Sequence, residues 1–234
     1  MESLQIRPIA TLATPYRDKF GVPRQPGLVP AATGRLVFEP AYRREEAVRG
    51  LDQFSHLWLI FVFSGVAEGE ERLSVRPPRL GGNQKLGVFA TRSPFRPNRL
   101  GLSACRLERI DWEDSEGPVL VLAGVDLVDG TPIVDVKPYL PYADGIAGAE
   151  SRLASEPPAK HEVRISAEAK EEFEALSSTE RDVVLQTLSL DARPAFHEEG
   201  RTYFLRLFDY DVAWRFVGDE CEVVAIRKFD SSAG

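Results

Sequence analysis

The residues best suited to chemistry lie close together in this 234-residue sequence. The stretch ATRSPFRPNRLGLS, residues 90–103, has Arg92, Arg96 and Arg99 within eight positions. Arginine suits carboxylate and phosphate groups because its guanidinium is a rigid, planar and always charged fork of donors. Phe95, between two of these arginines, offers a surface on which a nucleobase could stack. The alternative is an arginine-rich loop with ordinary surface ion pairs, each of which contributes little.

Carboxylates gather further along the chain, around the turn sequence LVDGTP. Asp126, Asp129 and Asp135 surround this turn, and an apolar segment precedes them. A carboxylate can act as a general base, although an aspartate in a turn more often only forms the turn. Taken together, these aspartates would line the rim of a barrel.

Two loops have a composition that suits the binding of a small molecule. In VPRQPGLVP, residues 22–30, three prolines stiffen the chain while Arg24 and Gln25 project planar hydrogen-bonding groups. In the segment that begins with RPPRLGGN, Gly81 and Gly82 allow the backbone to approach a ligand closely. For the loop of residues 22–30, the alternative is a proline-stiffened surface loop that binds no ligand.

The charge of the chain is unevenly distributed. The sequence has 29 Lys and Arg against 36 Asp and Glu, a net charge of −7. Between Arg72 and Arg109 there are nine basic residues and one acid, so this part carries +8 and the rest of the chain −15. Such a basic segment indicates either a face for a polyanion or solvated arginines paired to the acidic remainder.

Residues 1–145 read as short strands. Brief apolar runs recur between Gly- and Pro-containing turns, which predicts an all-β barrel or sandwich. HLWLIFVF, residues 56–63, is apolar throughout and predicts a strand buried on both faces, whereas PVLVLAGV alternates. We expect a helix over residues 41–54 and a tight turn at Asp129–Gly130.

The C-terminal part has a different character. Residues 146–160 are small, polar and proline-containing, which is typical of a linker. Beyond them, helices are expected to begin at Ser166 and Ser178, and three apolar runs, residues 202–208, 211–217 and 221–229, predict strands. We therefore expect a small α+β domain over residues 161–234.

Several classes of protein are disfavoured. Cys105 and Cys221 are far apart, and the histidines His56, His161 and His197 lack metal-binding spacing, so we expect a reduced cytoplasmic protein without a metal. Cys105 reads as a buried structural thiol. No apolar run reaches the ~18 residues of a membrane helix, and no signal peptide is expected. Phosphate-loop, nucleophile-elbow and dinucleotide-binding motifs are absent from the sequence.

Five segments together resemble one known family. They are PRQPGLV, AVRGLDQFSHLWLIFVF, VRPPRLGGN, GVFATRSPFRPNRLG and VDLVDGTPIVDVKPYLPYAD. They resemble the TrmO family (also called TsaA-like or YaeB-like): S-adenosylmethionine-dependent methyltransferases that act on N6-threonylcarbamoyladenosine beside the tRNA anticodon. The resemblance covers nearly all of residues 1–145, and DARPAF with DYDVAWRF resembles the family's C-terminal unit.

The resemblance implies a mainly β protein with a non-Rossmann methyltransferase barrel over residues 1–145. The sequence pattern adds a linker over 146–160 and a C-terminal domain over 161–234, for which docking of tRNA is a possible role. It also implies a homodimer with cofactor sites near the subunit interface. The implied contacts to S-adenosylmethionine come from Gln25, Pro26, Gly27, Phe63, Ser64, Arg92, Leu102, Ala123, Gly124, Val125 and Asp126.

The resemblance also suggests which residues act in catalysis and in substrate binding. Asp126, with Asp129 as second choice, would remove the N6 proton, or the substrate's own threonine carboxylate would do so. That carboxylate needs a cationic partner, for which Arg92, Arg96 and Arg99 are candidates. Arg76 and Arg79, with Arg96 and Arg99, would hold tRNA.

The sequence departs from the family pattern at two of these positions. Arg99 stands where relatives have proline, and Ser64 where relatives often have His or Asp. Two other functions stay open: an RNA-binding module without catalysis, and a methyltransferase of the same fold acting on another nucleoside or a small molecule.

Overall fold

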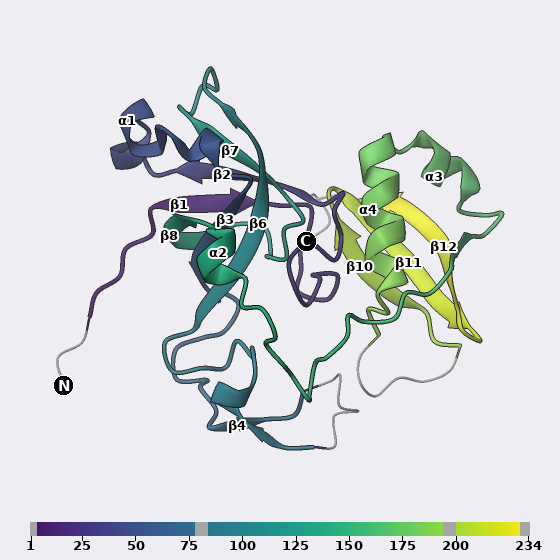
Figure 1. The fold of residues 1–234 in the computed structure, drawn as a ribbon. Coiled ribbons are helices and arrows are strands. Elements are labelled where there is room, and N and C mark those ends of the chain that lie inside the picture. Colours follow the sequence, from purple (N-terminus) through teal and green to yellow (C-terminus); the bar gives the residue numbers. More distant parts are fainter. Residues whose placement is uncertain (1–3, 78–83, 194–199, 230–234) are drawn as a thin grey trace.

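A closed barrel of six antiparallel strands forms the N-terminal part, in the order β1-β2-β7-β6-β3-β8 (Figure 1). The computed structural model describes residues 4–77, 84–193 and 200–229. The strands are β1 (Ala10–Ala13), β2 (Thr33–Phe38), β3 (His56–Val62), β6 (Leu100–Asp111), β7 (Val119–Ala123) and β8 (Thr131–Pro138). A small pair, β4 (Ser74–Val75) and β5 (Leu86–Gly87), lies in the β3–β6 connection. The predicted mainly β fold with a small barrel is confirmed.

The barrel interior is filled by alternate side chains of its strands. On β3, Leu57, Leu59 and Phe61 are buried while Trp58 and Ile60 are only half-buried. The prediction that this strand is buried on both faces is therefore wrong, because hydrophobicity alone does not tell which face the fold covers. It is β7 instead whose residues are buried throughout.

The helical segments around the barrel are short. They are η1 (Pro40–Tyr42), α1 (Glu45–Val48), η2 (Leu51–Gln53), η4 (Val88–Ala90) and α2 (Pro141–Asp144). The helix expected over residues 41–54 is broken into three pieces. Gly50 adopts φ 87°, a left-handed conformation that interrupts a right-handed helix. The expected turn at Asp129–Gly130 is present, with Gly130 at φ 76°.

A second sheet forms the C-terminal unit, in the order β10-β11-β12-β9, with β9 parallel to β12. Its strands are β9 (Val163–Ile165), β10 (Tyr203–Leu207), β11 (Tyr210–Val217) and β12 (Glu220–Lys228). Its helices are α3 (Lys170–Ala175) and α4 (Ser178–Ser189). The three predicted strands are present, and β9 was missed because a three-residue strand has too short a pattern.

The starts of the two C-terminal helices differ in how well local residues predict them. Ser177 and Glu180 form a reciprocal capping box ahead of α4, one residue before the expected start. The first helix begins only at Lys170, since the Ser166 hydroxyl accepts from the Ala169 N–H at 3.3 Å and closes a separate turn.

Strand direction brings three connections to one end of the barrel. Because all neighbouring strands are antiparallel, the ends of β1, β3 and β7 lie beside the starts of β2, β6 and β8. Residues 14–32, 63–77, 84–99 and 124–130 therefore share this end, which we call the barrel mouth. Figure 1 shows the purple 14–32 connection between the barrel and the C-terminal sheet.

Candidate active site

Two glycines set the closest backbone approach at the barrel mouth. The Gly27 N–H donates to the Gly124 carbonyl at 2.8 Å, and the Gly124 N–H donates to the Ala32 carbonyl at 2.8 Å. Gly124 has φ +70°, and a Cβ added to it would lie 2.9 Å from the Gly27 Cα. Only glycine fits such a position. The 22–30 loop thus lies directly on the end of β7.

Asp126 lies two residues beyond this contact. The buried Ser103 side chain of β6 hydrogen-bonds to the Asp126 carboxylate. Within the described part of the chain, Asp126 Oδ1 is shielded from solvent and has no hydrogen-bond partner. Burial raises the pKa of Asp126 to about 6, while the Ser103 side chain and the charge of Arg92 act to lower that pKa.

Arg92 joins the remaining pieces of the site. Its Nη1 donates to Oε1 of Gln25, which links the arginine-rich stretch to the 22–30 loop. Its positive charge also acts on Asp126, and its side chain remains exposed. Gln25, Arg92 and Asp126 come from three connections and meet at the barrel mouth.

The other residues implied as cofactor contacts lie along the same end of the barrel. The Phe63 N–H, just beyond β3, donates to the Arg99 carbonyl at 2.8 Å, and the Phe63 ring meets the Phe61 ring edge-on at 5.1 Å. Leu102 pairs with Ile60 across β3 and β6 and is 53% exposed. Ala123 and Val125 flank Gly124, Pro26 lies beside Gln25, and Ser64 is exposed.

Two of the predicted arginines hold the loop that contains them. Arg96 Nη1 donates to the Thr91 carbonyl at 2.9 Å, and Arg99 Nη1 donates to the Val66 carbonyl at 2.7 Å. Arg99 also adopts φ 50°, a left-handed conformation that a proline could not take. Both guanidinium groups are therefore partly engaged by the backbone.

The remaining basic and aromatic candidates are distributed as follows. Arg76 is exposed beside β4. The Arg72 guanidinium lies over the Phe95 ring at 4.3 Å, so one face of this ring is already covered. Arg79, Gly81 and Gly82 lie outside the described residues.

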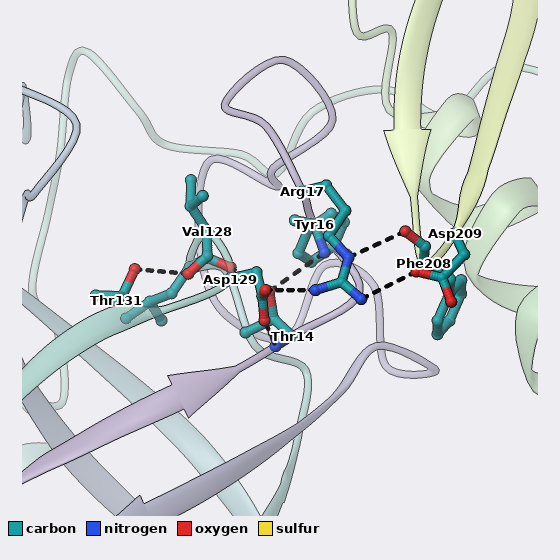
Figure 2. Close-up of polar contacts among 9 residues, drawn as sticks. Thr14, Tyr16, Arg17, Val128, Asp129, Thr131, Phe208 and Asp209 are labelled. Atoms are coloured by element: carbon teal, nitrogen blue, oxygen red, sulfur yellow. Dashed lines mark hydrogen bonds and ion pairs between the residues drawn. The ribbon is translucent and has the colours of Figure 1, made fainter. Parts of the chain in front are cut away.

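The other two aspartates are engaged in ion pairs. Asp129 Oδ1 accepts from the Thr14 N–H at 2.9 Å, and its Oδ2 is paired with Arg17 (Figure 2). Asp135 pairs with Lys137 at 2.8 Å on β8. Of the three aspartates around the turn, Asp126 is the one with an oxygen left unpartnered among the described residues.

The two cysteines and the described histidines, His56 and His161, belong to no metal-binding cluster. Cys105 and Cys221 are both buried free thiols; burial raises the pKa of Cys105 and takes that of Cys221 to about 12. His56 contacts the Ser55 hydroxyl at 2.9 Å, and His197 lies outside the described residues. Across residues 4–77, 84–193 and 200–229 no cluster of three or more His, Cys, Asp or Glu could hold a metal ion, and no helix is long and apolar enough to cross a membrane.

A separate hollow of about 280 Å³ lies on β1 and β2. Its lining residues are Thr11, Ala13, Val37, Phe38, Glu39, Arg43 and Glu116. None of them was predicted as a site residue, and the hollow is distinct from the Gln25, Arg92 and Asp126 group.

Sequence reasoning missed some residues of the mouth. Ser103 has no motif of its own, and only the tertiary structure brings its side chain to Asp126. Thr14 and Arg17 come from a segment without a recognisable pattern, and tertiary contacts join them to Leu127 and Asp129 of the 124–130 connection.

Both parts of the chain match models of one known protein family. The family model described as "tRNA-methyltransferase O N-terminal domain" matches residues 11–145, and the "TrmO C-terminal domain" matches residues 158–229. The chain therefore belongs to the TrmO family.

Similar proteins match over nearly the whole chain. The chain is 44% identical to an Escherichia coli K12 protein named tRNA (adenine(37)-N6)-methyltransferase, over 97% of this chain and 99% of that protein. It is 45% identical to a putative S-adenosylmethionine-dependent methyltransferase of Pseudomonas aeruginosa PAO1, over 90% and 92% of the two chains. A crystal structure of TrmO from P. aeruginosa superimposes with a TM-score of 0.80 at 36% identity and covers 97% of this chain and 98% of its own.

Proposed function

We propose that this chain is an S-adenosylmethionine-dependent tRNA methyltransferase that methylates N6 of threonylcarbamoyladenosine beside the anticodon. Membership of the TrmO family and the full-length match to the E. coli enzyme support this reaction. The structural observation that carries the proposal is the meeting of Gln25, Arg92 and Asp126 at the barrel mouth.

The residues of the mouth fit S-adenosylmethionine. The Gly27–Gly124 contact leaves backbone without side chains, so a ligand can approach the main chain closely. Asp126 Oδ1 is an acceptor that lacks a donor among the described residues, and Leu102 offers exposed apolar surface. S-adenosylmethionine supplies an electrophilic methyl group when bound. The residues that would hold it are Gln25 to Gly27, Phe63, Ser64, Arg92, Leu102 and Ala123 to Asp126.

Asp126 is the proposed general base. N6 of the substrate is bonded to a carbamoyl carbonyl and is a poor nucleophile while it keeps its proton. A carboxylate with a pKa of about 6 is ionised at neutral pH yet basic enough to accept that proton. Both oxygens of Asp129 are engaged, so we give Asp129 a positioning role instead.

Arg92 is the proposed partner of the threonine carboxylate. Its guanidinium is exposed, whereas Arg96 and Arg99 each donate to a backbone carbonyl of their own loop. Recognition of this carboxylate would select the threonylcarbamoyl form over plain adenosine, because a site built around a guanidinium loses its partner when the carboxylate is missing.

The tRNA footprint and the division into domains are further parts of the proposal. Arg76, exposed in the basic β3–β6 connection, would contact phosphates together with Arg79, Arg96 and Arg99. We assign methyl transfer to residues 1–145, a linker to 146–160 and tRNA docking to residues 161–234.

We also infer a cytoplasmic homodimer. The outward face of β3 presents the half-buried apolar side chains of Trp58 and Ile60, and Leu102 lies beside them on β6. Such a face suits a second copy of the chain. Ile60→Lys should lower the mass seen in analytical ultracentrifugation, and an unchanged mass would contradict this interface.

The test combines cofactor titration with turnover. Calorimetric titration of S-adenosylmethionine should give saturable heat, which an RNA-binding module without catalysis would not give. Methyl transfer should be fast on tRNA that carries the threonylcarbamoyl group and slow on the same tRNA without it. Equal rates on both would instead favour another acceptor nucleoside.

A further inference from the structure

The β1–β2 connection, which carries Gln25 and Gly27, is attached to the C-terminal unit at its beginning. Tyr16 forms a β-bridge with Leu207 of β10. The Phe208 N–H donates to the Pro15 carbonyl at 2.7 Å, and the Arg17 N–H donates to the Arg206 carbonyl at 3.3 Å. The first residues after β1 thus continue as a neighbour of the second sheet.

Arg17 joins three parts of the molecule through one guanidinium (Figure 2). Nε donates to the Phe208 carbonyl at 3.0 Å, and Nη2 donates to Asp209 Oδ1 at 3.2 Å, both in the β10–β11 turn. Nη1 is paired with Asp129 in the β7–β8 turn. The Arg17 guanidinium therefore links the β1–β2 connection, to which Arg17 itself belongs, to the C-terminal unit. It also links both of them to the β7–β8 turn, which follows Asp126.

The β7–β8 turn is held to the same connection by further hydrogen bonds. The Asp129 N–H donates to the Tyr16 carbonyl at 2.8 Å, and the Thr14 hydroxyl donates to the Leu127 carbonyl at 2.9 Å. Hydrogen bonds consequently join the connection that carries Asp126 to the connection that carries Gln25, and both are attached to the C-terminal unit.

The far end of the connection has its own contact with helix α4. Gln186 Oε1 accepts from the Ala31 N–H at 3.0 Å. Between the two ends, Gly21 lies against the Leu205 and Leu207 side chains of β10. The loop that holds Gln25 and Gly27 is thus fastened to the C-terminal unit on both sides.

We propose that the C-terminal unit is a positioning element of the cofactor site, with Arg17 and Gln186 as positioning residues. They hold residues 25–27 against Gly124 without touching the cofactor themselves. This inference rests on the proposed function, since it assigns the 25–27 loop to S-adenosylmethionine. It predicts that cofactor affinity depends on side chains that lie outside the barrel's own core.

The first test uses α4 of the full-length protein. Gln186→Leu removes the acceptor for Ala31, Gln186→Glu keeps it, and Asp182→Ala is an exposed control on the same helix. Because one hydrogen bond is lost, Gln186→Leu should raise the Kd for S-adenosylmethionine about fivefold. Gln186→Glu and Asp182→Ala should stay near the wild-type Kd at an equal Tm.

The second test is a double-mutant cycle on the Arg17–Asp209 pair. Arg17→Met should raise the cofactor Kd about tenfold, because three charge-assisted contacts are lost together. After Arg17→Met, Asp209→Asn should have no additional effect, since the pair then no longer exists.

Hydrogen exchange at the Gly27 N–H separates the two proposals, because it needs no cofactor. Faster exchange over residues 25–32 in Gln186→Leu, with the barrel strands unchanged, supports the positioning role. If this faster exchange is seen but the wild-type protein binds no S-adenosylmethionine, the proposed function is contradicted. The attachment of the 25–32 segment by Gln186 would then still hold. The positioning role would be overturned by a different outcome. In that case the wild type binds S-adenosylmethionine, and Gln186→Leu and Arg17→Met have the same Kd and the same hydrogen exchange as the wild type.

Discussion

Asp126, the proposed general base, is held in surroundings that cost stability. A buried carboxylate with an unpartnered oxygen is unfavourable, and folded proteins usually satisfy such groups. Ser103 and Arg92 compensate only in part, since the pKa is still raised to about 6. The same environment gives the carboxylate the basicity that proton removal near neutral pH requires.

The pH dependence of methyl transfer follows from this pKa. A general base must be ionised, so kcat/KM of the wild type should fall as pH drops through about 6. Asp126→Asn should lower kcat by about 10²- to 10⁴-fold, the usual contribution of a general base. A wild-type rate that stays flat from pH 5 to 8 would favour the substrate's own carboxylate as base.

The same group predicts a pH-dependent stability. Its folded-state pKa of about 6 lies above the ordinary 3.8, so the protonated form stabilises the fold below about pH 4 and this contribution is lost as pH rises through 6. Asp126→Asn should therefore raise the free energy of unfolding at pH 7.5 by up to about 3 kcal/mol. Urea unfolding at pH 4 and pH 7.5 measures this; an equal difference at both pH values would contradict it.

At the scale of elements, the meeting of the 22–30 loop and the end of β7 depends on two backbones that nearly touch. Gly124 has no room for a Cβ, since Gly27 Cα would lie 2.9 Å away. The loop itself is stiffened by prolines, so it cannot yield easily. This contact fixes where Gln25 stands relative to Asp126.

Gly124→Ala should therefore separate the loop from the strand. The positive φ and the close Gly27 together should cost about 2–4 kcal/mol in unfolding free energy and abolish saturable cofactor binding. Gly218→Ala is the matched control, because Gly218 has φ +62° with nothing within 4 Å of the added Cβ. Equal losses in the two variants would show that the conformation alone, and not the contact, matters.

At the scale of the whole molecule, the basic segment and the contacts to the C-terminal unit lie at the same end of the barrel. The basic β3–β6 connection belongs to the mouth, and so do the contacts to the C-terminal unit. Docked tRNA and cofactor would thus meet where Asp126 lies. The β2–β3 connection, with Arg49, belongs to the opposite end.

Salt dependence of tRNA binding tests this orientation. Arg76→Ala should weaken binding and lower the slope of log Kd against log salt by about one unit, because one phosphate contact is lost. Arg49→Ala, at the opposite end of the barrel, should leave the slope unchanged. If Arg76→Ala also leaves the slope unchanged, the tRNA lies elsewhere.

The sequence by itself determined the local and patterned features. Apolar runs between Gly and Pro turns predicted the barrel strands, and Ser177 with Glu180 caps α4 near the expected start. Long motifs such as ATRSPFRPNRLG carried the family resemblance, because they combine rigid backbone residues with a fixed set of arginines. These features depend on residues near one another in the chain.

Only the tertiary structure decided which of these residues act together. Whether β3 or β7 is covered on its outer face depends on packing, which hydrophobicity does not encode. The contacts of Arg92 with Gln25, of Arg17 with Asp129 and of Gln186 with Ala31 join residues 67, 112 and 155 positions apart, and no sequence motif marks them. The unpartnered oxygen of Asp126 is likewise a product of its tertiary surroundings. Strand register and interdomain hydrogen bonds create these contacts, and both exist only once the chain has folded.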